Sequence, residues 1–313
     1  MMMKAVKIVD KKPVLVDVPE PSGSGVKVKI VSSSICGSDI HMIAKGAFGD
    51  HIIGHEFSGI AEDGRAVAIE PITGCGLCMA CGDGHRIHCD AGIYVMGVLG
   101  DGGMAEYVSV PAANLVELPT GLDIRIASLI EPLAVAVHGL DRAHVREGDR
   151  VLIVGAGPIG LAIGAALRGR GLPYDIIARH DHQKIAAQKL GAGHRPNGHY
   201  DVVMDAVGSS ASLKQAVQMV KPMGRIGLVG VGWETIGLAP EFSGKEPMLI
   251  PSMGYNCKSP NRNFEEAGKI LHERPDISEA MVSHRFPLEA VTEAFATAAN
   301  RAAGAIKVVF DIA

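Results

Sequence analysis

The sequence predicts an α/β protein of two domains, one of them built on a doubly wound parallel sheet. The chain has 313 residues, more than the roughly 250–300 at which a single core stops growing. After residue 150, short apolar strands alternate with helical segments, as in parallel sheets covered by helices on both faces. Before that point, four cysteines gather between residues 75 and 89 and indicate a separate metal-binding lobe.

Composition and charge exclude several classes of protein. Hydrophobic residues make up 47% of the chain and the net charge is −4 with no basic tract, which argues for a globular chain without a nucleic-acid partner. No apolar run reaches the ~18 residues of a membrane span, and the start, MMMKAVKIVDKKP, lacks the apolar region of a signal peptide. We therefore expect a cytoplasmic protein without a membrane partner. Thiols stay reduced in that compartment, so clustered cysteines favour metal over disulfides.

The first candidate site is a dispersed set of metal-ligand residues. Cys36 follows the alternating strand VKVKIVSSS, His55 and Glu56 lie in IIGHEFSG, and Glu131 lies in SLIEPLAVAVHG. A catalytic zinc takes about three such ligands and keeps one exchangeable position. Taken singly, each residue has a simpler explanation as a buried thiol, a core histidine or a helix N-terminal carboxylate. Only the set predicts an open metal site.

The four clustered cysteines have the spacing C-x2-C-x2-C-x7-C, at Cys75, Cys78, Cys81 and Cys89. Gaps this short let one loop wrap a single ion, and zinc takes four thiolates tetrahedrally. Four thiolates leave no open position, so the site predicted for residues 74–90 is structural. An iron–sulfur cluster and a set of free or incidentally paired thiols are the alternatives.

The motif GAGPIG follows the apolar run RVLIV and precedes an alanine- and leucine-rich helical stretch. A G-x-G-x-x-G motif between strand and helix is typical of Rossmann dinucleotide-binding domains. Gly155 permits the turn, Gly157 admits the pyrophosphate, and Gly160 lets helix and strand pack closely. The helix N-terminus favours the phosphates. A glycine-rich turn in some other α/β fold is the alternative.

The sequence that follows this motif keeps the same rhythm. YDIIAR, DVVMDAVG and GRIGLVGVG read as strands, and HQKIAAQKLGA and SASLKQAVQMV read as the helices between them. An acidic residue usually ends the second strand and binds the ribose 2′-hydroxyl, but that position holds Arg179 here. Arginine would pair with a 2′-phosphate, so NADP(H) is expected over NAD(H). A solvated Arg179, or Asp181 reaching the ribose, is the alternative.

These motifs together resemble the zinc-dependent medium-chain alcohol dehydrogenases, and among them the sorbitol or polyol dehydrogenase-like branch. The resemblance spans nearly the whole chain and is carried by CGSDIH, GHEFSG, the cysteine lobe, EPLAVAVHG, GAGPIG and the closing HRFPLEAVTEAF and GAIKVVF. It implies a mostly β GroES-like catalytic domain formed by residues 1–140 and 276–313. The Rossmann domain would then comprise residues 141–275.

The resemblance also implies roles for individual residues. Cys36 and His55 match the family's catalytic zinc ligands, Glu56 is a further ligand in the polyol branch, and Glu131 binds the metal or its water. Ser38 would start a proton relay that His41 continues. The implied catalytic residues are therefore Cys36, Ser38, His41, His55, Glu56 and Glu131. The implied cofactor contacts are Gly155, Gly157, Pro158, Ile159, Gly160, Arg179, Val229 and Lys307.

The implied function is zinc-dependent hydride transfer between an alcohol and a nicotinamide dinucleotide. Polyols, sugar alcohols and secondary alcohols are the expected substrates, with two zinc ions per chain and a homodimer or homotetramer as the assembly. A dehydrogenase of threonine or simple alcohols and a non-enzymatic dinucleotide sensor are the alternatives. The segment GIAEDGRAVAIEP is shorter than the family's usual connection after G-H-E, which predicts a reduced hairpin there.

Overall fold

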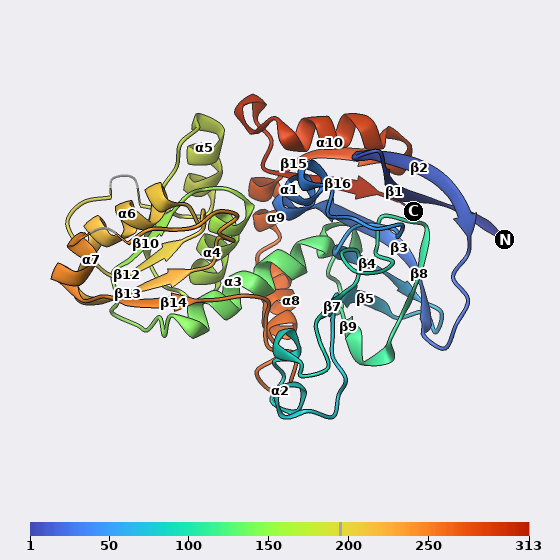
Figure 1. Ribbon diagram of the computed structural model, residues 1–313, viewed down its shortest axis with the longest axis horizontal. Helices are drawn as coiled ribbons and strands as arrows, with labels where there is room; N and C mark the ends of the chain where they lie inside the picture. Colours follow the sequence, from blue (N-terminus) through green and yellow to red (C-terminus); the bar gives the residue numbers. More distant parts are fainter. Residues whose placement is uncertain (194–195, 239, 313) are drawn as a thin grey trace. The chain divides into compact units, whose positions relative to one another are not determined.

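The computed structural model describes residues 1–193, 196–238 and 240–312 (Figure 1). The chain forms two compact units, Met1–Glu131 with Asn256–Ala313, and Pro132–Tyr255. The first unit is discontinuous, and its two segments are residues 1–131 and 256–313. Residues 256–275 belong to the first unit because helix α8 (Asn263–Glu273) places Gly268 against Pro119 and Ile130.

The first unit contains a seven-stranded sheet. Its strand order is β15-β16-β3-β4-β5-β9, with β8 also paired to β3. The strands are β3 (Val26–Ile35), β4 (Glu56–Ala61), β5 (Ala66–Ile69), β8 (Tyr107–Val110), β9 (Leu115–Glu117), β15 (Val282–Pro287) and β16 (Lys307–Asp311). Two further pairs are β1 (Met2–Val9) with β2 (Lys12–Pro19), and β6 (Ile72–Thr73) with β7 (Tyr94–Val95).

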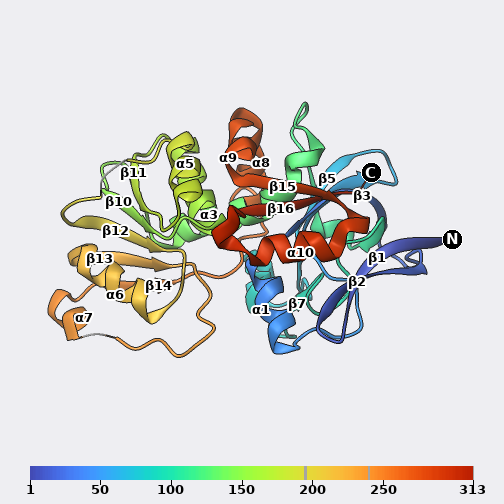
Figure 2. The ribbon, with the colours of Figure 1, turned by 90° about the horizontal axis from the view of Figure 1, so that it is seen from above.

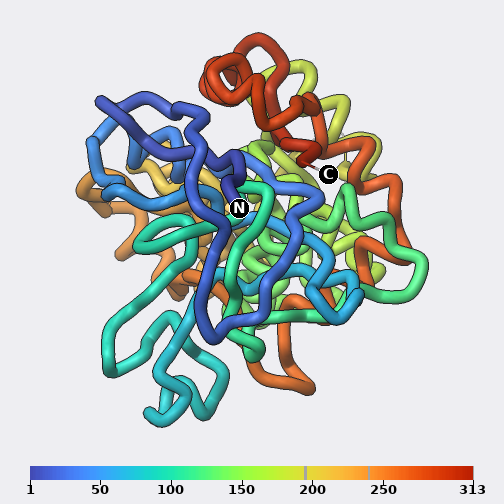
Figure 3. The backbone as a smooth tube through the Cα atoms, turned by 90° about the vertical axis from the view of Figure 1, so that its right-hand side faces the viewer, coloured from blue at the N-terminus to red at the C-terminus, as the bar shows by residue number. Residues whose placement is uncertain are grey.

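Short helices complete this unit. Besides α8 they are α1 (Gly37–Lys45), α2 (Met79–Gly82), α9 (Asp276–Met281) and α10 (Val291–Ala299), with five 3-10 turns. Helix α10 lies along β15 and β16 (Figure 2) and places Phe295 against Phe310 in a core shared with Ile53 and Met104. The backbone trace in Figure 3 has both chain ends in this unit.

The last strand, β16, pairs antiparallel with β3, so the C-terminal segment returns to the N-terminal sheet. The reduced hairpin expected from the sequence lies between β4 and β5. There the Ala61 N–H donates to the Arg65 carbonyl at 2.9 Å, and Gly64 turns the chain with φ of 88°. The connection between β4 and β5 is therefore only four residues long.

The second unit is a doubly wound Rossmann domain, as predicted. Its five parallel strands follow the order β11-β10-β12-β13-β14. They are β10 (Val151–Val154), β11 (Tyr174–Ile177), β12 (Tyr200–Asp205), β13 (Val220–Leu228) and β14 (Met248–Pro251). The helices are α4 (Pro158–Gly169), α5 (Asp181–Lys189), α6 (Ser210–Met219) and α7 (Pro240–Lys245), and α3 (Ile130–Arg142) begins at the end of the first unit.

The order of this sheet defines where a ligand binds. The order in which strands are added to the sheet reverses between β10 and β12. Ligands of doubly wound sheets bind at such a point, outside the carboxyl ends of the strands. Alternate residues of β10 face opposite sides, and Leu152 and Val154 pack with Leu213 of α6.

Among the described residues, no helix is long and apolar enough to cross a membrane.

A buried carboxylate ties the cysteine lobe to the segment after the second unit. Glu70 is fully buried and accepts from Arg262 at 2.9 and 2.7 Å and from Arg86 at 3.3 Å. Beside it, burial and then the charge of Glu70 raise the pKa of Cys257 to about 12. That thiol is therefore inert at neutral pH.

We predict that Arg262→Met destabilises the zinc-loaded protein by about 3–5 kcal/mol, because it leaves Glu70 buried with a single weaker partner. Urea unfolding measures the change. Arg274→Met is the matched control, since its carboxylate partner Asp276 is 43% exposed and such pairs contribute about 0–1 kcal/mol. Equal losses in the two variants would contradict the role of Glu70.

Candidate active site and metal centres

The open metal set forms where two neighbouring strands meet. Cys36 follows β3 and caps α1, and His55 precedes Glu56, the first residue of β4. One ligand atom from each of Cys36, His55 and Glu56 lies within 4.8 Å of the others. His55 and Glu56 are buried and Cys36 is half-buried. The structure thus brings together three of the four ligands predicted from dispersed motifs.

Glu131, the fourth predicted ligand, lies in the first turn of α3 and outside that tight set. Desolvation by the surrounding protein raises its pKa to about 8, and the negative charge of Glu56 adds to the effect. His55 and Lys307 oppose the shift. Neighbouring carboxylates repel each other unless a cation lies between them. The structure therefore places Glu131 within the electrostatic influence of Glu56, His55 and Lys307, but outside the tight set.

Asp39 orients the histidine of this set. Its Oδ1 lies 3.3 Å from His55 Nδ1, and its Oδ2 accepts from the Cys36 N–H at 2.9 Å. Burial lowers the pKa of His55, but the opposing charges of Asp39 and Cys36 outweigh burial and raise it well above its usual value. With this carboxylate beside Nδ1, the ring nitrogen Nε2 is the one left for a metal. Sequence analysis missed Asp39, although it lies in the CGSD motif.

The two predicted relay residues both lie on α1. Ser38 Oγ is 3.4 Å from His55 Nε2, on the metal-facing side of the ring. His41 follows one turn later and is exposed, and residues three apart share a helix face. Partial burial and then Arg301 lower the pKa of His41. The serine therefore lies at the open set, and the histidine lies between it and solvent.

Lys307, which the resemblance implies as a cofactor contact, lies beside the open metal set in the structure. It begins β16, and its side chain is 1% exposed. Its Nζ donates to both carboxylate oxygens of Glu56 at 2.7 Å and to the Ile35 carbonyl at 3.3 Å. The ammonium therefore neutralises a carboxylate of the metal set. The strand pairing that brings it there is not visible in the local sequence.

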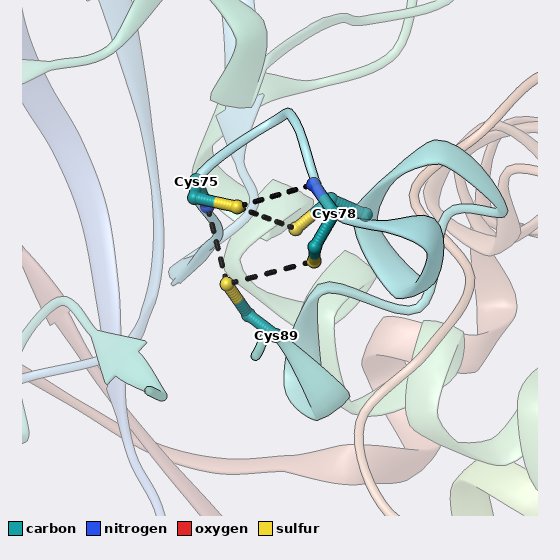
Figure 4. Close-up of side chains that lie close together, drawn as sticks. Cys75, Cys78 and Cys89 are labelled. Atoms are coloured by element: carbon teal, nitrogen blue, oxygen red, sulfur yellow. Dashed lines mark hydrogen bonds between the residues drawn. The ribbon is translucent and has the colours of Figure 1, made fainter. Parts of the chain in front are cut away.

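The four clustered cysteines converge as predicted, and Figure 4 shows three of them facing one another. The sulfurs of Cys75 and Cys81 and those of Cys78 and Cys89 are 4.0 Å apart. Four sulfurs about 2.3 Å from one zinc ion stand about 3.8 Å apart, so the set fits a single ion. Backbone N–H groups of Leu77 and Cys78 lower the pKa of Cys75, which favours the thiolate that binds metal.

The glycine motif has the geometry that a dinucleotide needs. Gly155 turns the chain with φ of 95°, and a Cβ at Gly160 would lie 1.8 Å from the Gly155 carbonyl oxygen. A Cβ at Gly157 would meet nothing within 4 Å, so this backbone is open to a ligand. Pro158 begins α4, with Ile159 next to it. The Gly157 backbone therefore fits the approach of a pyrophosphate.

The other expected cofactor contacts lie near the carboxyl edge of the same sheet. Arg179 follows β11 and is exposed. Asp181, the alternative candidate for the ribose contact, forms an ion pair with Lys184 at 2.8 Å. Val229 is buried, and its N–H donates to the Asp205 carbonyl at 2.9 Å. Val229 thus shapes the end of β13 through its backbone, whereas Arg179 places an exposed positive charge after β11.

Comparison with known proteins identifies the family. Residues 22–120 match the alcohol dehydrogenase GroES-like domain. L-galactonate-5-dehydrogenase from Escherichia coli K12 is 31% identical over 314 residues, covering 89% of this chain and 89% of the relative. The chain belongs to the zinc-dependent medium-chain alcohol dehydrogenases. Other relatives of this dehydrogenase are named for L-arabinitol and galactitol 1-phosphate, which confirms the polyol dehydrogenase-like branch.

Solved structures agree with this assignment. A dehydrogenase (rspB) from E. coli CFT073, complexed with NADH, has a TM-score of 0.88 at 28% identity and covers 99% of each chain. A zinc-binding dehydrogenase from Sinorhizobium meliloti 1021, bound to NADP, has a TM-score of 0.86 at 26% identity, again over 99% of each chain. This dehydrogenase is therefore an enzyme that transfers a hydride between an alcohol and a nicotinamide dinucleotide.

Proposed function

We propose that this dehydrogenase oxidises a secondary hydroxyl group of a polyol or sugar alcohol, or reduces the corresponding ketone. The observation that carries the proposal is the buried cluster of Cys36, His55 and Glu56, with ligand atoms within 4.8 Å of one another. The names of the relatives support the substrate class, since they include L-galactonate, L-arabinitol and galactitol 1-phosphate.

In this proposal Cys36, His55 and Glu56 hold the catalytic zinc, and Glu131 supports it or its water. Zinc supplies Lewis acidity that lowers the pKa of an alcohol. Ser38 accepts the hydroxyl proton, because its Oγ lies on the metal-facing side of His55. His41, exposed one turn further along α1, passes that proton to solvent. A bound nicotinamide dinucleotide would supply the hydride acceptor, and the protein would orient it and exclude water.

The metal content tests this assignment. We expect two zinc ions per chain, one in the closed set of four cysteines and one in the open set. Metal analysis of protein purified without chelator should approach two equivalents, and dialysis against a chelator should empty the open set first. Activity should fall in step with that first loss. A reproducible single equivalent in fully active protein would contradict the proposal.

We further propose a cytoplasmic homodimer or homotetramer. None of the six cysteines forms a disulfide bond, which suits a reducing compartment. Strand β14 is at the edge of its sheet; Met248, its first residue, is 55% exposed, and Met253, two residues after its end, is 57% exposed. An exposed apolar edge strand is a template for pairing with a second chain. Light scattering that detects only monomers at micromolar concentration would refute the assembly.

The final element of the proposal is a preference for NADP(H) over NAD(H). Arg179 is exposed after β11, where most dinucleotide-binding domains that favour NAD carry a carboxylate. Charge-assisted hydrogen bonds contribute about 1.5–3 kcal/mol, which corresponds to roughly ten- to hundredfold in kcat/KM. Family members use both dinucleotides, so this position can decide between them.

We expect Arg179→Asp to reverse the preference, because a carboxylate repels the 2′-phosphate and accepts from the ribose hydroxyl. The measurement is kcat/KM for each dinucleotide with a common alcohol substrate. Lys214→Asp is the control, since it makes the same change of charge on the exposed side of α6. Better use of NAD by the wild type, or an equal effect of Lys214→Asp, would show that Arg179 does not select the cofactor.

A further inference from the structure

Strand β3 carries three consecutive buried serines whose hydroxyl groups have different surroundings. Ser32 donates to Ser128 at 3.0 Å, and Ser34 donates to Glu56 Oε2. Ser33 Oγ is buried without a hydrogen-bond partner among the described residues. All three residues are 0% exposed. The Ser34 hydroxyl therefore contacts a residue of the metal set, whereas the neighbouring Ser33 hydroxyl does not.

The register of the sheet brings Ser34 to Glu56. The two residues are directly opposite each other in the antiparallel pair β3–β4, and side chains in such positions start about 4.5–5.5 Å apart. Strand β16 pairs with the other edge of β3 and supplies Lys307. The Glu56 carboxylate is thus held by a serine from the adjacent strand and by a lysine from the strand beyond it.

The two contacts restrain Glu56 in different ways. Lys307 donates to both oxygens at 2.7 Å, but an ammonium on a flexible stem acts as a point charge that tolerates rotation of the carboxylate. A buried hydroxyl at a fixed strand position supplies a directed bond to one named oxygen. Ser34 therefore restricts the orientation of Glu56, and Lys307 compensates its charge.

We propose that Ser34 is a positioning residue of the catalytic metal centre, which holds the Glu56 carboxylate in its orientation beside Cys36 and His55. This inference rests on the proposed function, because it takes the open set to be a zinc site. Outer hydrogen-bond partners of metal ligands typically contribute about 10–100-fold to metal affinity or activity. Loss of the Ser34 hydroxyl should fall in that range.

The test compares Ser34→Ala with Ser33→Ala, which removes an equally buried hydroxyl from the same strand. Zinc affinity of the open set is measured in the full-length protein by competition with a chromophoric chelator, with the four-cysteine site kept filled. The visible spectrum of the cobalt(II)-substituted protein reports the ligand geometry independently of activity. We expect Ser34→Ala to weaken zinc binding about 10–100-fold and alter the cobalt spectrum, and Ser33→Ala to change neither.

Ser34→Thr keeps the hydroxyl on a residue suited to strands and should retain wild-type affinity, which separates loss of the bond from disturbed packing. Unchanged zinc affinity and cobalt spectrum in Ser34→Ala, or equal weakening in Ser33→Ala, would overturn the inference. A wild-type protein that binds only the structural ion would instead refute the proposed function itself. The two failures are therefore distinguishable.

Discussion

The pairing of β3 with β4 on one edge and with β16 on the other is the constraint on which the catalytic centre depends. Cys36 follows β3, Glu56 begins β4 and Lys307 begins β16. A shift of one residue in either pairing would turn the side chains to the opposite face of the sheet. Backbone hydrogen bonds along whole strands therefore determine the position of a few metal-binding atoms.

The two metal sets differ in their burial and in the groups that stabilise them. The cysteine set is closed, half-exposed and stabilised by backbone donors, so a metal there holds the lobe together and does no chemistry. The open set buries Glu56 with Lys307, both about 1% exposed, although desolvating such a pair costs several kcal/mol per ion. A pair this costly is more readily explained by the positioning of a cation ligand than by stability.

Within the described residues, two parts of the fold are short. A four-residue turn joins β4 to β5, and the cofactor sheet has five strands in the described part of the chain, where the usual dinucleotide-binding order has six. Gly193 forms an isolated bridge to Asp175 of β11. The turn at Gly155 and the open backbone at Gly157 are both present in this sheet.

The sequence alone determined the features that depend on short spacing. The four cysteines lie within fifteen positions, and G-x-G-x-x-G between strand and helix is a local pattern, so both motifs could be interpreted without coordinates. The candidate zinc ligands Cys36, His55, Glu56 and Glu131 came from separate motifs that pointed to a metal site only as a set, and the family resemblance then implied their individual roles. The contacts of Arg262 and Gly268 with residues distant in sequence, which join residues 256–275 to the first unit, have no local signature.

Only the tertiary structure decided which groups hold the catalytic set in place. Lys307 reaches Glu56 across 251 positions, and Ser34 reaches it across 22. Neither contact has a local signature, because strand register arises from pairing between distant segments. Asp39 is near Cys36 in sequence, yet its 3.3 Å approach to His55 also depends on how α1 follows β3. Sequence motifs name residue types, and the sheet determines which of them meet.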